Sequence, residues 1–171
     1  MRKSVKIVGA MAFKVFLSYS TDPDEQVIVW RLQTLATASG IHVYVPQRHF
    51  PRVKPMPSDE VKSAIDESNC VLALITTNTS AEVENELSYA LASHKLVIPI
   101  VENTVRLNPE LLAKFPRGVF SFSRHQVPGR IENDVVMFLK QEKLSKENQN
   151  LVGALVAVGL GLLLLVALTK E

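Results

Sequence analysis

Residues 70–91 read CVLALITTNTSAEVENELSYAL, an apolar run that leads through a polar loop into an amphipathic segment. The run CVLALIT shows no alternation of apolar and polar residues, so it predicts a strand that is covered on both faces of a sheet. In the segment that follows, Val83, Leu87 and Ala90 share one face of a helix and are expected to be buried. A buried strand followed directly by an amphipathic helix is the repeating unit of a parallel α/β sheet.

The same alternation continues on both sides of this stretch. Apolar strands are expected at FKVFLS, IHVYV, LVIPIV and GVFSFS, and helices at residues 26–38, 58–68 and 128–142. Gly40 is a candidate cap for the first of these helices. Residues 46–57 hold four prolines and are expected to form an extended loop. Five strands in regular alternation with helices predict a parallel sheet with helices on both faces.

Ligands of such sheets bind beyond the carboxyl ends of the strands. In this chain those ends carry the polar sequences SYSTD, PQRHF, TTNTS and VENT. The predicted architecture therefore proposes a site lined by Ser18, Tyr19, Ser20, Arg48, Asn78 and Ser80.

Three glutamates, Glu82, Glu84 and Glu86, lie close together in the helix after the TTNTS loop. Thr79 and Glu82 fit the capping-box pattern, in which a hydroxyl residue is followed three positions later by glutamate, with Ser80 as an alternative cap. Glu84 is expected to face solvent. Glu86 lies at the border of the buried face, one turn further on, and is expected to face the crevice above the strand ends.

The overall composition gives the chain no strong electrostatic preference. Its 171 residues include 19 basic and 17 acidic side chains, without the basic stripe and interleaved aromatic residues that are typical of nucleic-acid binding. No nucleic-acid partner is therefore expected. Cys70, the single cysteine, is expected as a buried core thiol. The four histidines are scattered, and their spacing predicts no metal site.

The segment 151–168 contains 18 residues without a charged or polar side chain, which predicts a transmembrane helix. Lys140, Lys143 and Lys146 precede it and only Lys170 follows, so the preceding domain is expected on the cytoplasmic side. The chain is thus predicted to be a single-pass, tail-anchored membrane protein that contacts lipid.

These patterns divide the chain into an N-terminal extension (1–12), a folded domain (13–144), a juxtamembrane linker (145–150) and the transmembrane helix (151–168). Within the last segment, Gly153, Ala157 and Gly161 recur every four residues. Such small residues allow close helix packing and self-association, although the small-residue composition of the segment explains the pattern equally well.

The motifs VFLSYS, IHVYV, CVLALIT, SAEVENEL and LVIPIV, in this order and spacing, resemble TIR (Toll/interleukin-1 receptor) domains over about residues 14–101. With the apolar tail, the chain resembles prokaryotic TIR proteins that carry a C-terminal transmembrane helix. The resemblance implies the TIR fold, a flavodoxin-like α/β arrangement, and self-association through the domain. Ser80, Val83 and Glu86 match the family's serine-to-glutamate motif, so the resemblance implies that Glu86 is catalytic.

The activity implied by the resemblance is cleavage of the nicotinamide–ribose bond of NAD+, which is a substrate here, without a metal. The substrate-binding residues would be Ser18, Tyr19, Ser20, Arg48, Phe50, Asn78 and Ser80, with Tyr19 or Phe50 stacking on a base and Arg48 meeting phosphates. The expected role is that of a membrane-anchored NAD+ glycohydrolase activated by self-association, as in an antiviral cell-suicide effector. The alternatives are a non-enzymatic TIR–TIR interaction module and an enzyme like the nucleoside deoxyribosyltransferases.

Overall fold

A computed structural model of the chain describes residues 12–48 and 56–168, with side chains as far as Gln149. Five parallel strands form one sheet in the order β2-β1-β3-β4-β5. The strands are β1 (Phe13–Ser18), β2 (Ile41–Tyr44), β3 (Cys70–Ile75), β4 (Val97–Glu102) and β5 (Phe120–Phe122). The predicted five-stranded parallel sheet is confirmed, and its strand order is that of the flavodoxin-like folds.

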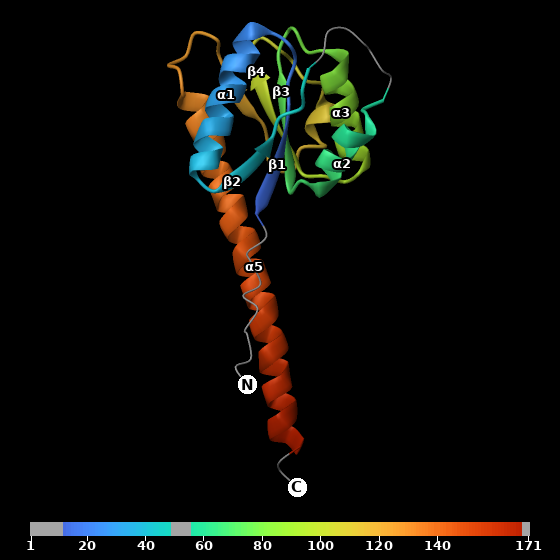
Figure 1. Ribbon diagram of the computed structural model, residues 1–171, viewed down its shortest axis with the longest axis vertical. Helices are drawn as coiled ribbons and strands as arrows, with labels where there is room; N and C mark the ends of the chain where they lie inside the picture. Colours follow the sequence, from blue (N-terminus) through green and yellow to red (C-terminus); the bar gives the residue numbers. More distant parts are fainter. Residues whose placement is uncertain (1–11, 49–55, 169–171) are drawn as a thin grey trace, which may run out of the picture. The chain divides into compact units, whose positions relative to one another are not determined.

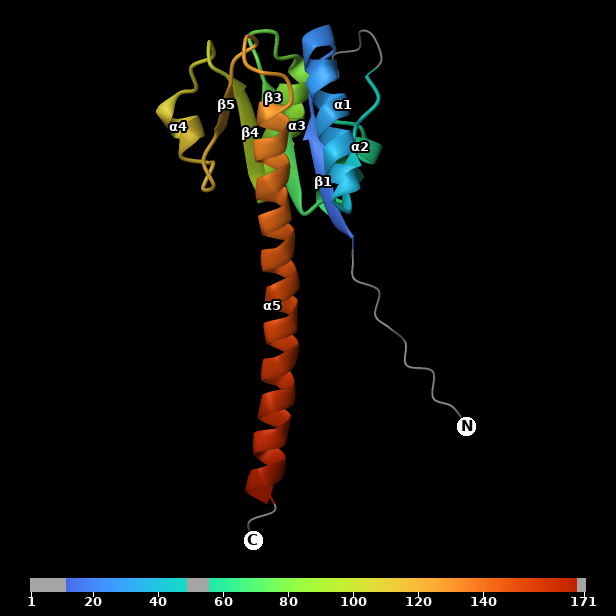
Figure 2. The same cartoon turned by 90° about the vertical axis from the view of Figure 1, so that its left-hand side faces the viewer.

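The helices are α1 (Pro23–Ala38), α2 (Asp59–Glu67), α3 (Ala81–Ala92), α4 (Pro109–Leu112) and α5 (Arg130–Leu168). Figure 1 shows α1 and the first turns of α5 on one face of the sheet and α2 and α3 on the other. The short helix α4 lies beside β5 at the edge of the sheet (Figure 2). Helices on both faces explain why every residue of β3 and β4 is buried.

Apolar residues of the central strands and of α2 and α3 form a continuous core on the Glu86 side of the sheet. Phe16 of β1 is fully buried there and stacks on Tyr44 of β2, with ring centroids 5.6 Å apart. Val83, Leu87 and Ala90 form the buried face of α3, as predicted, and Cys70 is buried in β3. This packing fixes α3 and the side chains that it carries.

Local capping sets the helix boundaries. Helix α1 begins at Pro23, earlier than predicted, because the Asp22 side chain accepts hydrogen bonds from the backbone N–H groups of Asp24 and Glu25. Helix α4, which the sequence reading missed, begins with Pro109 after Asn108 accepts from Leu111 N at 2.7 Å. Gly40 follows the last residues of α1 with a positive φ of 69°, the conformation that glycine adopts without strain.

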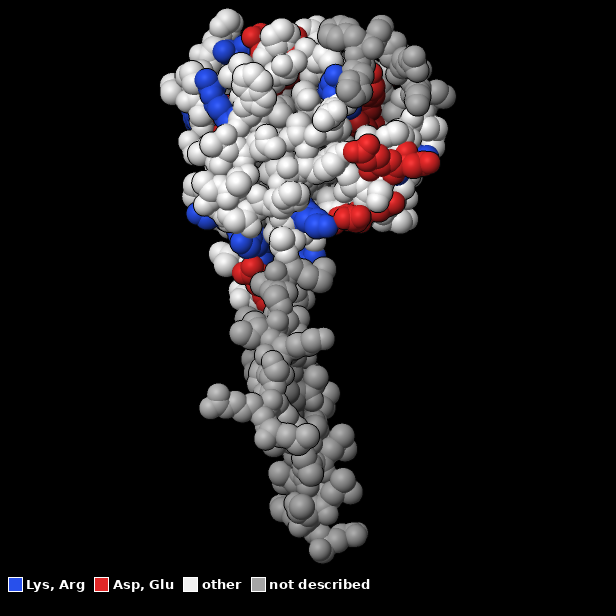
Figure 3. All heavy atoms as spheres, in the orientation of Figure 1, with Lys and Arg blue, Asp and Glu red and all other residues white. Residues whose placement is uncertain are grey.

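Exposed acidic side chains gather over α2, at the right of Figure 3. Asp59 and Glu60 occupy the first turn, where they complement the helix dipole, and Ser58 caps the helix. Glu67, at the other end of α2, accepts a hydrogen bond from Lys14 Nζ at 2.9 Å. Local helix electrostatics and this ion pair therefore account for three of these charges.

Helix α5 is continuous from Arg130 to Leu168 and includes the expected linker at 145–150. Met1–Val136 form one compact unit, and Met137–Glu171 form a second. Within the part of the chain whose side chains are described, no helix is long and apolar enough to cross a membrane. The predicted transmembrane segment 151–168, with Gly153, Ala157 and Gly161, has side chains outside the described residues.

Candidate functional site

Glu86 differs sharply from its two acidic neighbours on α3. Its side chain is only 3% exposed, whereas Glu84 faces solvent as predicted and Glu82 is partly exposed. The register of α3 produces this difference, because Glu86 lies beside the buried Leu87 and Val83. A buried carboxylate needs specific partners to balance the loss of hydration, so the contacts of Glu86 define the site.

Three donor groups meet the Glu86 carboxylate. Ser18 Oγ, at the end of β1, donates to Glu86 Oε2 at 2.5 Å. Arg48 Nη1 donates to Oε1 at 2.6 Å and Arg48 Nη2 donates to Oε2 at 2.8 Å, a bidentate ion pair. The Arg48 side chain is itself only 9% exposed. The pair is therefore largely desolvated, and removing either partner would leave an unpaired buried charge.

Arg48 is held in place by Tyr19. Arg48 Nε donates to the Tyr19 carbonyl oxygen at 2.8 Å, and the guanidinium lies 5.0 Å from the centre of the Tyr19 ring. The Tyr19 hydroxyl in turn donates to the Pro46 carbonyl at 3.3 Å. Burial alone would lower the pKa of Arg48, but the hydrogen bonds and charge of Glu86 outweigh it and raise that pKa. The guanidinium therefore stays protonated.

Ser80 stands at the start of α3 with a buried hydroxyl group. Its backbone occupies the N-cap position, yet its side chain makes no capping hydrogen bond. Among the described residues, Ser80 Oγ has no hydrogen-bond partner at all. Since buried hydroxyl groups normally have a partner, Ser80 Oγ is an exception among the described residues.

The predicted capping box of Thr79 and Glu82 is wrong. The helix begins at Ala81, so Glu82 lies one position too early to fold back onto the cap. The Thr79 hydroxyl instead donates to the Thr76 carbonyl at 2.7 Å and accepts from Thr76 N at 2.9 Å. This local turn uses the side chain that a capping box would need.

Ser20 and Asn78 belong to a second polar network. Ser20 N donates to Glu25 Oε2 at 2.7 Å, and Asn78 Nδ2 donates to Asp22 Oδ2 at 2.6 Å. The predicted site residues thus fall into two groups. Ser18, Tyr19 and Arg48 surround Glu86, whereas Ser20 and Asn78 point to the loop before α1. Phe50 lies outside the described residues.

Sequence reasoning missed four charged residues at the same end of the sheet. The buried Glu25 accepts from Thr76 Oγ1 at 2.5 Å, and Arg124 Nε donates to the buried Glu102 at 2.7 Å. Glu132 is buried on α5. Glu102 belongs to the strand-end sequence VENT, although it was not named as a site residue, and Arg124 follows the fifth strand, where the same rule could have found it. Glu132 carries a weaker signal, because it lies next to the buried Ile131.

The site lies where the strand order of the sheet reverses. Chain connections leave β1 and β3 toward opposite sides at this point, which is where sheets of this order leave a crevice for ligands. Ser18 ends β1, and the loop to Ser80 and α3 follows β3. The described residues contain no cluster of side chains that could hold a metal ion. The chemistry available here is that of a single fixed carboxylate with hydroxyl groups and a guanidinium.

Comparison with known families agrees with this architecture. The family model of the TIR domain matches residues 15–130, which is more than half of the chain. The chain therefore belongs to the TIR domain family. No curated protein matches its sequence.

Solved structures with a related arrangement are distant in sequence. The CMP N-glycosidase BcmB of Clostridium botulinum is 18% identical, with a TM-score of 0.50 over 75% of this chain and 98% of that chain. The TIR domains of the activated Roq1 resistosome are 20% identical, with a TM-score of 0.46 over 78% and 82%. A 2-deoxyribosyltransferase of Bacillus psychrosaccharolyticus is 14% identical, with a TM-score of 0.46 over 69% and 95%. At these identities, the likeness to BcmB supports the fold alone.

The unpartnered hydroxyl of Ser80 predicts an unusual response to mutation. Ser80→Ala should leave the free energy of unfolding within about 0.5 kcal/mol of the parent, because the lost hydroxyl group makes no hydrogen bond. Ser58→Ala is the matched control, since Ser58 accepts a capping bond from Val61 N and should lose about 1 kcal/mol. Urea unfolding of the three proteins measures the difference. Equal losses at both serines would show that Ser80 is an ordinary cap.

The ion pair between Arg124 and Glu102 predicts that the stability of the fold depends on pH. The hydrogen bond from Arg124 lowers the pKa of Glu102 against the opposing effect of burial, with further help from Thr77 N. A carboxyl group with a lowered pKa stabilises the fold above its ordinary pKa of about 4.3, and this stabilisation disappears as the pH falls through the folded-state value. Arg124→Gln should therefore cost about 1–2 kcal/mol at pH 7, and the cost should decrease as the pH falls below the ordinary pKa of glutamate.

Unfolding free energies at several pH values test this expectation. Arg106→Gln is the control, because Arg106 is exposed and should have no effect at any pH. A cost of Arg124→Gln that is the same at pH 7 and pH 3 would contradict the assigned role of Glu102.

Proposed function

We propose that this TIR domain is an NAD+ glycohydrolase that cleaves the nicotinamide–ribose bond with Glu86 as its catalytic carboxylate. The observation that carries the proposal is the buried position of Glu86 at the reversal of strand order, with Ser18 Oγ 2.5 Å from its Oε2 atom. The matching exposed acid, Glu84, has no such surroundings. Membership of the TIR family supports the same choice of residue.

One carboxylate is sufficient for this reaction. Nicotinamide in NAD+ is a cationic leaving group, so it departs with the electron pair of the C–N bond and needs no acid to protonate it. Positive charge then develops on the ribose, and the fixed carboxylate of Glu86 stabilises it. Water adds to the ribose carbon and releases one proton, giving ADP-ribose and nicotinamide. Glu86 would also hold a ribose hydroxyl group, and Ser80 Oγ offers a further hydrogen-bonding position.

Arg48 has to leave the carboxylate before a ribose can reach it. The bidentate pair uses both oxygens of Glu86, at 2.6 and 2.8 Å. Once withdrawn, the Arg48 guanidinium would be available for the pyrophosphate of the substrate. Self-association through the domain would supply the free energy for this withdrawal. In the proposed cycle the described arrangement is thus the resting state.

The same ion pair favours a second candidate function, a non-enzymatic TIR–TIR interaction module. In that case Arg48 and Glu86 would remain paired and would serve to fix the end of β1 against α3. The two candidates differ in whether the carboxylate ever becomes free, so a test of turnover distinguishes them.

The decisive experiment is incubation of the full-length chain with NAD+ at high protein concentration, in detergent, with nicotinamide measured by chromatography. Glu86→Gln should lower the rate of release at least about 100-fold, because the neutral amide cannot stabilise the developing ribose cation. Glu84→Gln removes an equal charge from the exposed face of α3 and should remain within about twofold of the parent.

Two further measurements make a negative result informative. The oligomeric state is recorded in the same samples, and Arg48→Ala is assayed as a form in which the carboxylate is free. If neither the parent nor a folded Arg48→Ala protein releases nicotinamide while clustering is retained, the enzymatic proposal fails and the interaction module stands.

We also propose that residues 151–168 anchor the protein in a membrane as a single-pass tail, with the TIR domain on the cytoplasmic side. The support is the uncharged 18-residue segment and the lysines before it. In this setting, activation by self-association and consumption of NAD+ would suit an antiviral cell-suicide effector.

Gly153→Leu with Gly161→Leu should reduce the oligomer size in detergent by blocking close helix packing, while the protein stays in the membrane fraction. Unchanged assembly would remove Gly153 and Gly161 from the proposed interface, and recovery in the soluble fraction would contradict the anchor.

A further inference from the structure

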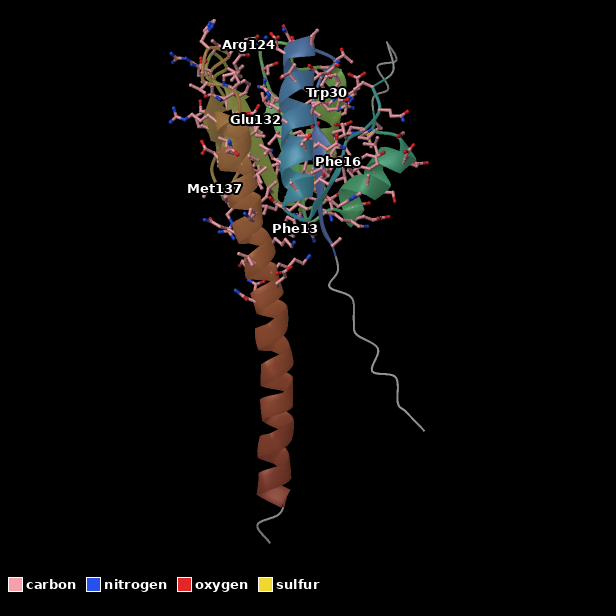
Figure 4. The ribbon with its side chains drawn as sticks, turned by 60° about the vertical axis from the view of Figure 1, so that its left-hand side comes forward. Phe13, Phe16, Trp30, Arg124, Glu132 and Met137 are labelled. Carbon is pink, nitrogen blue, oxygen red and sulfur yellow. The ribbon has the colours of Figure 1, made fainter. Side chains whose placement is uncertain are left out.

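A cavity lies on the opposite face of the sheet from Glu86. It has a volume of about 230 Å3 and is bounded by α1, the end of β5, the loop after it and the first turns of α5. Figure 4 shows Arg124 in that loop and Glu132 on α5 below it. The cavity-lining residues that matter here are Glu25, Ile28, Arg31, Phe122, Ile131 and Glu132.

Glu132 is the unusual member of this set. Its side chain is only 1% exposed, and its ion pair with Arg31 is long, with Arg31 Nη1 3.5 Å from Oε1. Within the described part of the chain, the buried Oε2 atom has no hydrogen-bond partner. A buried carboxylate oxygen without a donor is costly and is rarely retained without a reason. Glu132 is also one of the residues that line the cavity.

The second buried acid of the cavity, Glu25, already has its partners. Ser20 N donates to one of its oxygens at 2.7 Å, and Thr76 Oγ1 donates to the other at 2.5 Å. Glu132 Oε2 is therefore the open acceptor among the buried carboxylates that line the cavity.

The charge balance of the cavity favours a cation. Two carboxylates, Glu25 and Glu132, are almost fully buried, while the side chain of Arg31 is 43% exposed and only loosely paired. Arg124 Nε donates to Glu102 Oε1 and Arg124 Nη1 donates to Asp24 Oδ2, at 2.7 Å in each case. An incoming anion would meet uncompensated negative charge, whereas an ammonium group would neutralise it.

The remaining walls are apolar. Phe122 and Ile131 are buried and Ile28 is half-buried, so part of the cavity would cover a hydrocarbon surface. The volume suits a molecule of about one ring, below the size of drug-like ligands. An apolar wall with one convergent polar group is the usual composition of a small-molecule site.

We propose that this cavity is a binding site for a small amine, whose protonated nitrogen donates to Glu132 Oε2 while its apolar body packs against Ile28 and Phe122. The site is separate from Glu86, and the inference does not depend on the proposed NAD+ cleavage. It accounts for the open carboxylate oxygen, the long distance to Arg31 and the apolar walls together.

Benzylamine is a suitable probe because it is cationic at pH 7 and carries a single ring. Binding to the full-length chain is measured by saturation-transfer NMR, with benzyl alcohol and benzoate as neutral and anionic probes of the same ring size. Saturable binding of benzylamine is expected, at least about 10-fold tighter than that of benzyl alcohol, with no binding of benzoate. Absence of saturable benzylamine binding, or equal binding of benzoate, would overturn the proposal.

Two variants locate the bound probe, and a third serves as control. Glu132→Gln should weaken benzylamine binding at least about 10-fold by removing the negative charge. Ile28→Phe should abolish it by filling the cavity without changing any charge. Glu84→Gln makes the same chemical change on the exposed face of α3 and should leave binding within about twofold.

The melting temperature separates loss of binding from loss of folding. Glu132→Gln should melt no lower than the parent, because it removes a buried and poorly paired charge. If that variant nevertheless fails to fold, Ile28→Phe decides the question on its own. Benzylamine binding that persists within twofold in a folded Glu132→Gln or Ile28→Phe protein would place the probe elsewhere and overturn the assignment.

Discussion

The burial of the Glu86 carboxylate is the constraint on which the site depends. An ionised group that is 3% exposed is stable only with donors on every side, and these come from separate parts of the chain. Ser18 belongs to the end of β1, Arg48 follows β2, and Glu86 belongs to α3. Formation of the Arg48–Glu86 ion pair therefore requires the sheet, helix α3 and the loop after β2 to be in place together. The Tyr19 carbonyl adds a further restraint on Arg48, so the geometry is fixed by the fold.

On the opposite face of the sheet, the buried carboxylates differ in how completely they are hydrogen-bonded. Glu102 is paired with Arg124, and Glu25 is satisfied by a backbone amide and a threonine hydroxyl group. Glu132, with one long contact to Arg31, is the exception. Buried charges thus line the same edge of the sheet on both faces, and their satisfaction ranges from complete to partial.

Sequence alone was sufficient for the sheet and for most helices because their patterns depend on local burial. CVLALI and LVIPIV have no polar residue that would allow a solvent-exposed face, and Val83, Leu87 and Ala90 define the orientation of α3. Glu86 could be chosen over Glu84 by the same register. The sequence does not show which distant segments come into contact. Arg48 was therefore expected to bind phosphates, and its pairing with Glu86 was not predicted. The start of α1, the short α4 and the local turn of Thr79 were also missed, because competing side-chain caps decide them.

Because Arg48 is part of the same chain as Glu86, it acts as an intramolecular ligand of the Glu86 carboxylate. It therefore competes with any external ligand for that carboxylate. Its effective concentration is set by the fold, which holds Arg48 Nη1 2.6 Å from Glu86 Oε1, and does not change when the protein is diluted. An incoming molecule that needs the carboxylate therefore binds with an apparent Kd equal to its intrinsic Kd divided by the fraction of molecules in which Arg48 is detached. The ion pair thereby sets a concentration threshold for ligands of Glu86, and any contact that draws Arg48 away lowers that threshold without altering the ligand's own contacts.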